Sequence, residues 1–151
     1  MRKQFLVMLL ATLLLLIGCN TKKDPYQFHN SLEKVVSIEL LHNRNEDGIG
    51  TNEANIYQIY SLREDEISAF MEELYELETD RKLPPEWGYG DYIAKVSYSN
   101  GDVEMFGSLH IEFIPADHGE DYLYGYGSYR FESKEAFIRL LEKFCELPKE
   151  V

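Results

Sequence analysis

The sequence predicts an α+β domain: an antiparallel sheet of four to five strands, covered on one face by two helices, in the order ββ-α-ββ(β)-α. Three observations predict it. Several short runs alternate apolar and polar residues, two longer segments carry apolar stripes at helical spacing, and an Asn100-Gly101 pair joins two of the short runs. Strands that follow each other closely along a chain favour antiparallel pairing.

The first two strands are predicted at residues 35–41 and 56–60. In the first, every second residue from Val36 to Leu40 is apolar, which gives one apolar face. The second reads Ile-Tyr-Gln-Ile-Tyr and is expected to pair antiparallel with the first. The polar loop between them, residues 42–53, is long for a hairpin, and long loops inside compact domains are often functional.

The first helix is predicted to begin with a capping box, in which Ser61 is the cap and Glu64 the acid three residues on. Five apolar residues then recur at helical spacing and form a stripe expected to face the sheet: Ile67, Phe70, Met71, Leu74 and Leu77. The helix is expected to end before the prolines at 84 and 85. Residues 82–91 are expected to be a connector.

Asn100-Gly101 predicts a two-residue type I′ hairpin turn, because both central residues of that turn need a positive φ. Folding about this turn pairs Val96 with Met105 and Ala94 with Gly107. The apolar pattern crosses Gly107 without changing phase, so one long strand bent at Gly107 and two separate strands both fit.

A last strand is predicted at residues 122–131, where tyrosines alternate with glycines. Ser133 is expected to cap the final helix, which should end near Leu147-Pro148. The apolar stripe of that helix consists of Phe137, Leu140, Leu141 and Phe144.

The N-terminus has the layout of a signal peptide. Met1-Arg2-Lys3 is basic, residues 5–17 are apolar apart from Thr12, and Leu16-Ile17-Gly18-Cys19 follows. That ending resembles the lipobox of bacterial lipoproteins, and the resemblance covers residues 1–19. It implies diacylglycerol on the Cys19 sulfur, cleavage before Cys19, and further acylation such as palmitate.

The resemblance divides the chain into a signal peptide at 1–18, a lipidated tether at 19–31 and a single domain at 32–151. A tether of this length would span roughly 20 Å as a coil. Two acyl chains anchor a protein stably. The expected location is therefore a membrane face outside the cytoplasm, by default the outer face of the plasma membrane of a one-membrane bacterium.

The charge of the chain excludes some partners. The formal net charge is −12, and removal of residues 1–18 takes away Arg2 and Lys3 but no acid, which leaves −14. This balance argues against nucleic acid and against adsorption to anionic lipid head groups. A diffuse acidic surface gives solubility and suits a basic partner, but a total charge does not select one.

Candidate catalytic and metal-binding residues are sparse. Cys145 is read as a packing residue in the last helix, since the four histidines are scattered. Residues 43–48 resemble the opening of a calcium loop but lack its first Asp and, at Ala54, its final Glu. Residues 117–121 are a second acidic loop that could hold Ca²⁺ weakly. We assign no metal and no cofactor.

Aromatic residues beside glycines form the candidate binding surface: Trp87, Tyr89, Tyr122, Tyr124 and Tyr126. Such residues give large rigid contact areas with a polar tip. The alternative explanation is that half of them lie in the core and the rest line an edge strand. We expect a non-catalytic binding module for a protein or cell-envelope partner. A narrower version of this expectation is an inhibitor or immunity-type protein. The alternatives are a small metal-dependent or hydrolytic enzyme of the envelope, and a structural role without a discrete ligand.

Overall fold

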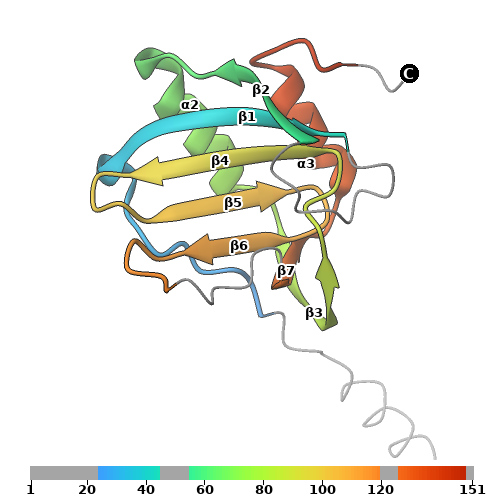
Figure 1. Ribbon diagram of the computed structural model, residues 1–151. Coiled ribbons are helices and arrows are strands. Elements are labelled where there is room, and N and C mark those ends of the chain that lie inside the picture. The colour runs from blue at the N-terminus through green and yellow to red at the C-terminus, as the bar shows by residue number, and fades with distance from the viewer. Residues whose placement is uncertain (1–23, 45–54, 120–125, 149–151) are drawn as a thin grey trace, which may run out of the picture.

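The computed structural model describes residues 24–44, 55–119 and 126–148, with only the backbone described at 82–87 and 126–128. It is an α+β fold in which seven strands form one open antiparallel sheet of order β2-β1-β4-β5-β6-β7-β3 (Figure 1). The predicted class is confirmed, but the sheet has more strands than the four to five expected. The elements are η1 Leu32–Lys34, β1 Val35–Asn43, β2 Ile56–Ser61, α2 Glu64–Tyr75, β3 Thr79–Trp87, β4 Tyr92–Tyr98, β5 Val103–Gly107, β6 Ile111–Ile114, β7 Tyr126–Phe131 and α3 Lys134–Glu142.

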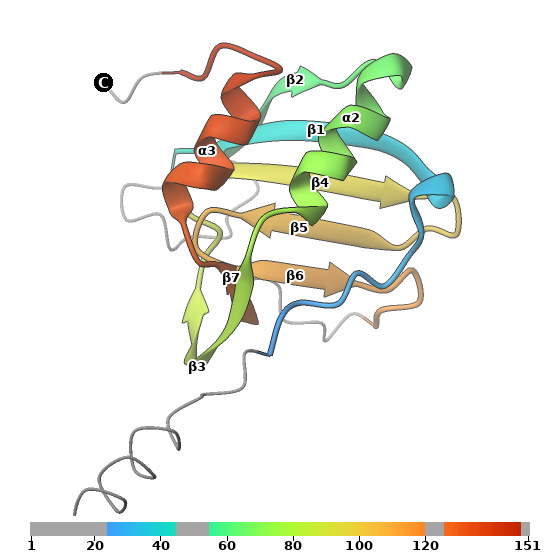
Figure 2. The same ribbon diagram turned by 180° about the vertical axis from the view of Figure 1, so that it is seen from behind.

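Both helices lie on the same face of the sheet (Figure 2). Helix α2 runs from the β2 edge across part of that face, and the chain then continues into β3 at the other edge of the sheet. The predicted stripes are confirmed as core. The fully or nearly buried residues under the helices are Ile38, Leu40, Phe70, Met71, Leu74, Ala94, Val96, Phe106, Phe137, Leu140 and Leu141.

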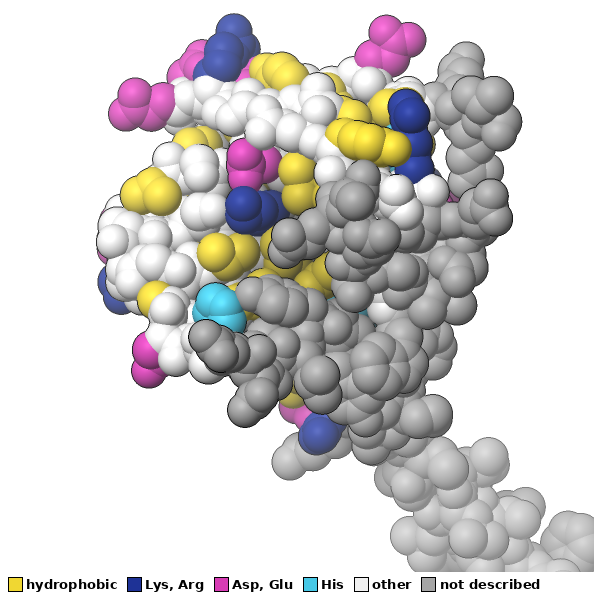
Figure 3. All heavy atoms as spheres, in the orientation of Figure 1, with side chains coloured by type: hydrophobic (Ala, Val, Ile, Leu, Met, Phe, Trp, Pro, Cys, Tyr) yellow, Lys and Arg dark blue, Asp and Glu magenta, His cyan; other side chains and the backbone are white. Residues whose placement is uncertain are grey.

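The other face of the sheet carries mixed apolar and charged side chains (Figure 3). On this face Glu39 of β1 and Lys95 of β4 are directly opposed and form an ion pair with Nζ and Oε2 2.9 Å apart. Because both side chains are partly exposed, the pair contributes little to stability. The two-layer arrangement therefore buries one face of the sheet with helices.

The first helix begins later than the sequence predicts. Ser61 is the last residue of β2, where it pairs with Glu39, so it does not cap the helix. Arg63 is the N-cap, and the Glu66 carboxylate accepts hydrogen bonds from the Arg63 backbone N–H and guanidinium at 2.9 and 2.8 Å. Glu66 thus has the capping-box role that the sequence predicts for Glu64, two residues earlier.

The predicted connector at residues 82–91 is in large part a strand. Strand β3 pairs antiparallel with β7, and the register breaks between Arg81 and Glu86. Pro84 and Pro85 lie inside that break, on an edge strand, which are the places where a sheet tolerates proline because no ladder N–H is needed. Because proline is rare inside strands, the sequence predicts a connector here and not a strand.

The hairpin at Asn100-Gly101 exists, but its turn and register differ from the prediction. Only Gly101 has a positive φ, of 91°, and Gly101 N–H donates to the Tyr98 carbonyl, so the loop has three residues. Val96 therefore opposes Glu104, and Ala94 opposes Phe106. This shift by one residue moves Glu104 and Phe106 to the helix face of the sheet.

The chain turns back at Gly107 rather than continuing as one bent strand. Gly107 N–H donates to the His110 carbonyl at 2.9 Å, and β6 pairs antiparallel with β5. A side chain at 107 would strike the Tyr89 backbone, because an added Cβ would lie 2.4 Å from the Tyr89 carbonyl oxygen. Of the two arrangements left open by the sequence, two separate strands is the one observed.

The end of the chain agrees with the sequence at its cap. The Ser133 hydroxyl accepts a hydrogen bond from the Ala136 N–H at 3.1 Å, as expected for an N-cap. Helix α3 ends at Glu142, a few residues before the predicted Leu147. Of the predicted last strand, the part from Tyr126 onward is observed as β7.

Residues 24–31, the part of the predicted tether that the structure describes, pack on the domain. We call residues 24–31 the strap. Tyr26 is 7% exposed and Asn30 is 8% exposed. The predicted signal peptide and the predicted lipidation site, Cys19, lie outside the described residues. Within the part of the chain that is described, no helix is long and apolar enough to cross a bilayer.

Candidate functional site

A groove runs between the strap and the C-terminal end of α2. Its volume is about 280 Å³. Its walls come from three segments: the strap, the end of α2 with the link to β3, and the residue after β7. The lining residues are Pro25, Tyr26, Phe28, Tyr75, Glu76, Leu77, Glu78, Thr79 and Glu132.

A second hollow of about 390 Å³ adjoins the first and extends it toward the start of α3. The two share four lining residues: Glu76, Leu77, Glu78 and Glu132. The second also contains Ser133 and Ala136. Together they form one continuous groove, which we call the α2–strap groove, with aromatic rings at the strap end and carboxylates along its middle.

The groove is electrically negative. Glu76, Glu78 and Glu132 are exposed, and each carries a formal negative charge near neutral pH. The N-terminus of α3 lies at one end and opposes them with the equivalent of about half a positive charge. The charged side chains that line the groove are these three acids, so its lining suits a cationic ligand.

The aromatic wall depends on the strap. Phe28 packs edge-on against Tyr75 of α2 with ring centroids 4.2 Å apart. Tyr26 packs against Phe106 and Tyr129 with centroids 5.9 and 5.4 Å apart. Tyr75 is 36% exposed, and its pKa is raised by burial and by the charge of Glu104. The end of α2 thus meets the strap through rings rather than through a backbone ladder.

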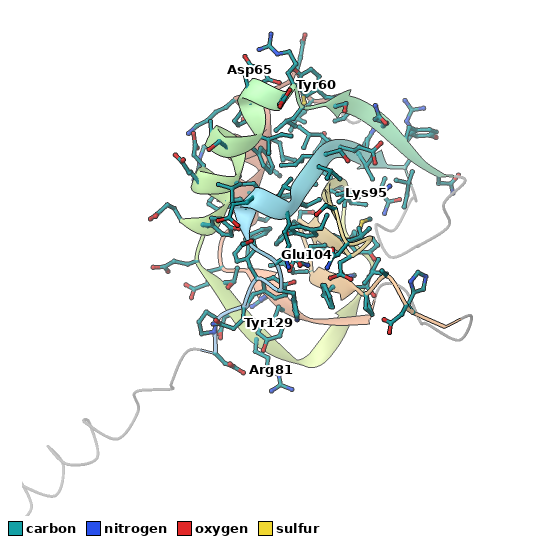
Figure 4. All side chains as sticks on the ribbon, turned by 90° about the vertical axis from the view of Figure 1, so that its left-hand side faces the viewer. Tyr60, Asp65, Arg81, Lys95, Glu104 and Tyr129 are labelled. Atoms are coloured by element: carbon teal, nitrogen blue, oxygen red, sulfur yellow. The ribbon has the colours of Figure 1, made fainter. Side chains whose placement is uncertain are left out.

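Glu104 holds the strap from inside the domain, where its side chain is fully buried (Figure 4). Its Oε1 accepts hydrogen bonds from the Tyr26 hydroxyl at 2.6 Å and from the His29 N–H at 3.0 Å. Its Oε2 accepts a hydrogen bond from the Tyr98 hydroxyl of β4. One carboxylate oxygen therefore serves the strap and the other serves the sheet.

This arrangement gives hydrogen-bond donors to both oxygens of a buried carboxyl group, and a buried polar group without partners would be costly. Burial and the hydrogen bond to Glu104 raise the pKa of Tyr98, so its phenol remains protonated and able to donate.

The His29 ring stacks on Phe113, with centroids 3.9 Å apart and planes 11° apart. Figure 4 shows Tyr129 and Arg81 at the end of the domain where the strap enters, and Tyr60 and Asp65 at the opposite end.

Two polar contacts fix the remainder of the strap. Tyr26 N–H donates to the Thr79 hydroxyl at 2.9 Å, beside the groove. Asn30 donates to the Asp102 carboxylate at 2.9 Å, at the β4–β5 turn. Hydrogen bonds from Asn30 and from the Ala116 N–H lower the pKa of Asp102. The strap is held at both ends, by β3 and by the β4–β5 hairpin.

Of the aromatic residues predicted as a binding surface, the structure describes the side chain of Tyr89 and only the backbone of Trp87 and Tyr126. Tyr89 is 3% exposed and donates to Glu112, so its assignment to an exposed surface is wrong. Trp87 and Tyr126 are backbone partners in the β3–β7 ladder, which brings these two positions together at one edge of the sheet. Tyr122 and Tyr124 lie outside the described residues.

A second buried polar cluster supports Tyr89 on the face opposite the helices. His110 is 1% exposed, its ring lies 4.4 Å from that of Tyr89, and its Nδ1 hydrogen-bonds the Gly88 carbonyl. His110 Nε2 lies 3.9 Å from the Glu112 carboxylate. Gly88 and Gly90 have φ of 81° and 79°, which allow this close approach. The cluster fixes residues 88–90 against β5 and β6.

The other candidate groups lie apart. His42 stacks on Tyr92, and His118 lies in an exposed loop where it contacts the Pro115 carbonyl. Burial raises the pKa of the Cys145 thiol, in agreement with its packing against the core. Of the calcium-like loop only Asn43 and Arg44 are described, and Glu120 and Asp121 of the second loop are not. Among the described residues no three His, Cys, Asp or Glu side chains gather as a metal site.

Sequence reasoning missed the α2–strap groove and the role of Glu104. The predicted pairing of Val96 with Met105 puts Glu104 on the sheet face away from Val96, whereas Glu104 lies directly opposite Val96. Tyr26 and Phe28 were assigned to a tether because the strap has no periodic pattern. The signal that could have found them is the pair of aromatic residues in an otherwise polar stretch.

No family model, curated protein or solved structure matches this chain.

Proposed function

We propose that this protein is a lipid-anchored extracytoplasmic binding module that holds a basic segment of a protein partner in the α2–strap groove, close to the membrane. The observation that carries the proposal is the composition of the groove, which combines an aromatic wall with carboxylates. The aromatic wall is built from the chain segment that follows the lipobox cysteine. Glu76, Glu78 and Glu132 supply the charge. A Lys or Arg side chain suits both, since its stem packs on rings and its head pairs with carboxylates.

The position of the groove relative to the anchor supports a partner at the membrane. Tyr26 lies seven positions after Cys19, and a chain of that length reaches at most about 25 Å. A ligand in the groove is therefore held near the bilayer surface. An inhibitor or immunity-type protein is one form of such a module, because masking a basic surface of a secreted toxin or hydrolase needs no chemistry of its own.

Crosslinked capture from native membranes tests the proposal. The full lipoprotein, tagged at its C-terminus, is compared with E76K/E132K, which reverses two groove charges, and with E72K/E142K, which makes the same charge change at exposed positions of α2 and α3 outside the groove. We expect one dominant protein partner, reduced at least tenfold by the groove variant and retained by the control. Equal capture by both variants would remove the groove as the site, and absence of any partner would count against a binding function.

A further inference from the structure

We propose that the strap is a removable wall of the α2–strap groove and that Glu104 is the latch that keeps it in place. This inference rests on the proposed function, since it concerns the control of the same groove. When the strap is docked the groove has its aromatic wall. When the strap leaves, Pro25, Tyr26 and Phe28 leave with it, and the groove is reduced to the carboxylate side.

The strap is held differently from the rest of the domain. Residues 24–31 belong to no strand or helix, whereas the neighbouring β4 and β5 are paired on both sides. Side-chain contacts to Thr79, Glu104 and Asp102 fix it instead. The rings of Tyr26, Phe28 and His29 add packing contacts. A segment outside the backbone ladders opens at lower free energy than the sheet beneath it. Opening of the strap alone is therefore the first local transition expected of this fold.

The two oxygens of the Glu104 side chain accept hydrogen bonds from different parts of the protein, one from the strap and one from the sheet. Glu104 Oε1 accepts from the Tyr26 hydroxyl and the His29 N–H of the strap, while Oε2 accepts from Tyr98 of the sheet. Hydrogen bonds to an ionised carboxylate are the strong ones. This division provides a matched pair of variants, because Tyr26→Phe removes a strap contact and Tyr98→Phe removes a sheet contact of the same carboxylate.

Strap docking and ligand binding are then coupled in both directions. A partner that touches the strap and α2 together favours the docked state, and the docked state binds that partner more tightly. The strap is also the link to the membrane anchor. Its eight residues add at most about 28 Å of reach when released. The docked state thus combines a complete groove with a domain held close to the membrane, and the released state has neither.

Hydrogen–deuterium exchange of the full lipidated protein in detergent tests the latch. In Tyr26→Phe we expect the peptide containing the His29 amide to exchange on the order of 10- to 100-fold faster, the factor expected for one hydrogen bond to a charged group. Peptides of β4 and β5 should be unchanged. Tyr98→Phe should leave strap exchange within about threefold of the wild type. Unchanged strap exchange in Tyr26→Phe, or an equal increase throughout the sheet, would overturn the proposal.

A second arm separates this inference from the proposed function. The same Tyr26→Phe variant is examined by crosslinked capture of the partner whose binding depends on Glu76 and Glu132. Reduced capture together with faster strap exchange supports the removable wall. Faster strap exchange with full capture would overturn the wall while leaving the groove proposal intact. Full capture by the charge-reversal variant E76K/E132K would instead overturn the groove proposal itself.

Discussion

Replacing Gly107 with alanine is expected to destabilise the domain strongly. An added Cβ at 107 would lie 2.4 Å from the Tyr89 carbonyl oxygen and 2.8 Å from the Tyr89 Cα. Ordinary carbon–carbon contacts are about 3.5–4.0 Å, so residues 88–90 would have to move by about 1 Å. That movement would disturb the hydrogen bond from the Leu109 N–H to the Tyr89 carbonyl, now 3.1 Å long.

We expect Gly107→Ala to lower the free energy of unfolding by about 3 kcal/mol, from the strain of overpacking and one weakened hydrogen bond. The midpoint of thermal unfolding should fall by roughly 10 °C. Urea unfolding of residues 20–151 measures the effect, and an unchanged m-value would show that the denatured state is unaffected. Gly119→Ala is the control, since an added Cβ there meets no atom within 4 Å.

The control should change stability by less than about 0.5 kcal/mol, as for an ordinary surface substitution. If Gly107→Ala and Gly119→Ala had the same stability, the close approach of Tyr89 to β5 would be refuted. The account of the second hairpin would fail with it, because that approach is the reason for a glycine at the turn.

Three further predictions concern single side chains. Ser133→Ala should cost about 1 kcal/mol through loss of the α3 cap, while Ser133→Asn should restore most of it, as measured by thermal unfolding. Because Asp102 has a folded pKa below its unfolded value, its contribution to stability is complete above the unfolded value and is lost as pH falls below about 4; Asp102→Asn should flatten that part of the acid unfolding profile. Because the pKa of the Cys145 thiol is raised by burial, alkylation by iodoacetamide at pH 8 should be slower than for a free cysteine and should accelerate in urea.

Periodicity alone predicted the helix faces, β1, β2 and the class of the fold. Phe70 and Leu74 of α2, and Phe137 and Leu141 of α3, are buried as their spacing requires. Such patterns are local in the sequence, and burial of the apolar face in the core stabilises the helix directly. Strand β3 was missed for the opposite reason: Pro84 and Pro85 contradict a central strand, and only the finished sheet shows that this strand is at an edge.

The candidate site depends on the register of the β4–β5 hairpin, which the sequence pattern predicts less well than it predicts the apolar face of a helix. Asn100-Gly101 is compatible with a two-residue and a three-residue loop, and the choice between them decides whether Glu104 faces solvent or the core. Once Glu104 is inside, it needs donors, and Tyr26 and Tyr98 provide them. A buried carboxylate and its partners lie far apart in sequence, so no local pattern indicates them.

The measurement that tests the central claim most directly is site-specific photocrosslinking of the full-length protein in its native cells. A photoreactive residue is placed at position 76, in the groove, and in a matched variant at position 65, an exposed position near the other end of α2 and outside the groove. We predict an adduct with one protein partner at 76 that is weak or absent at 65. An equal adduct at both positions, or an adduct at 65 alone, would contradict the proposed groove site.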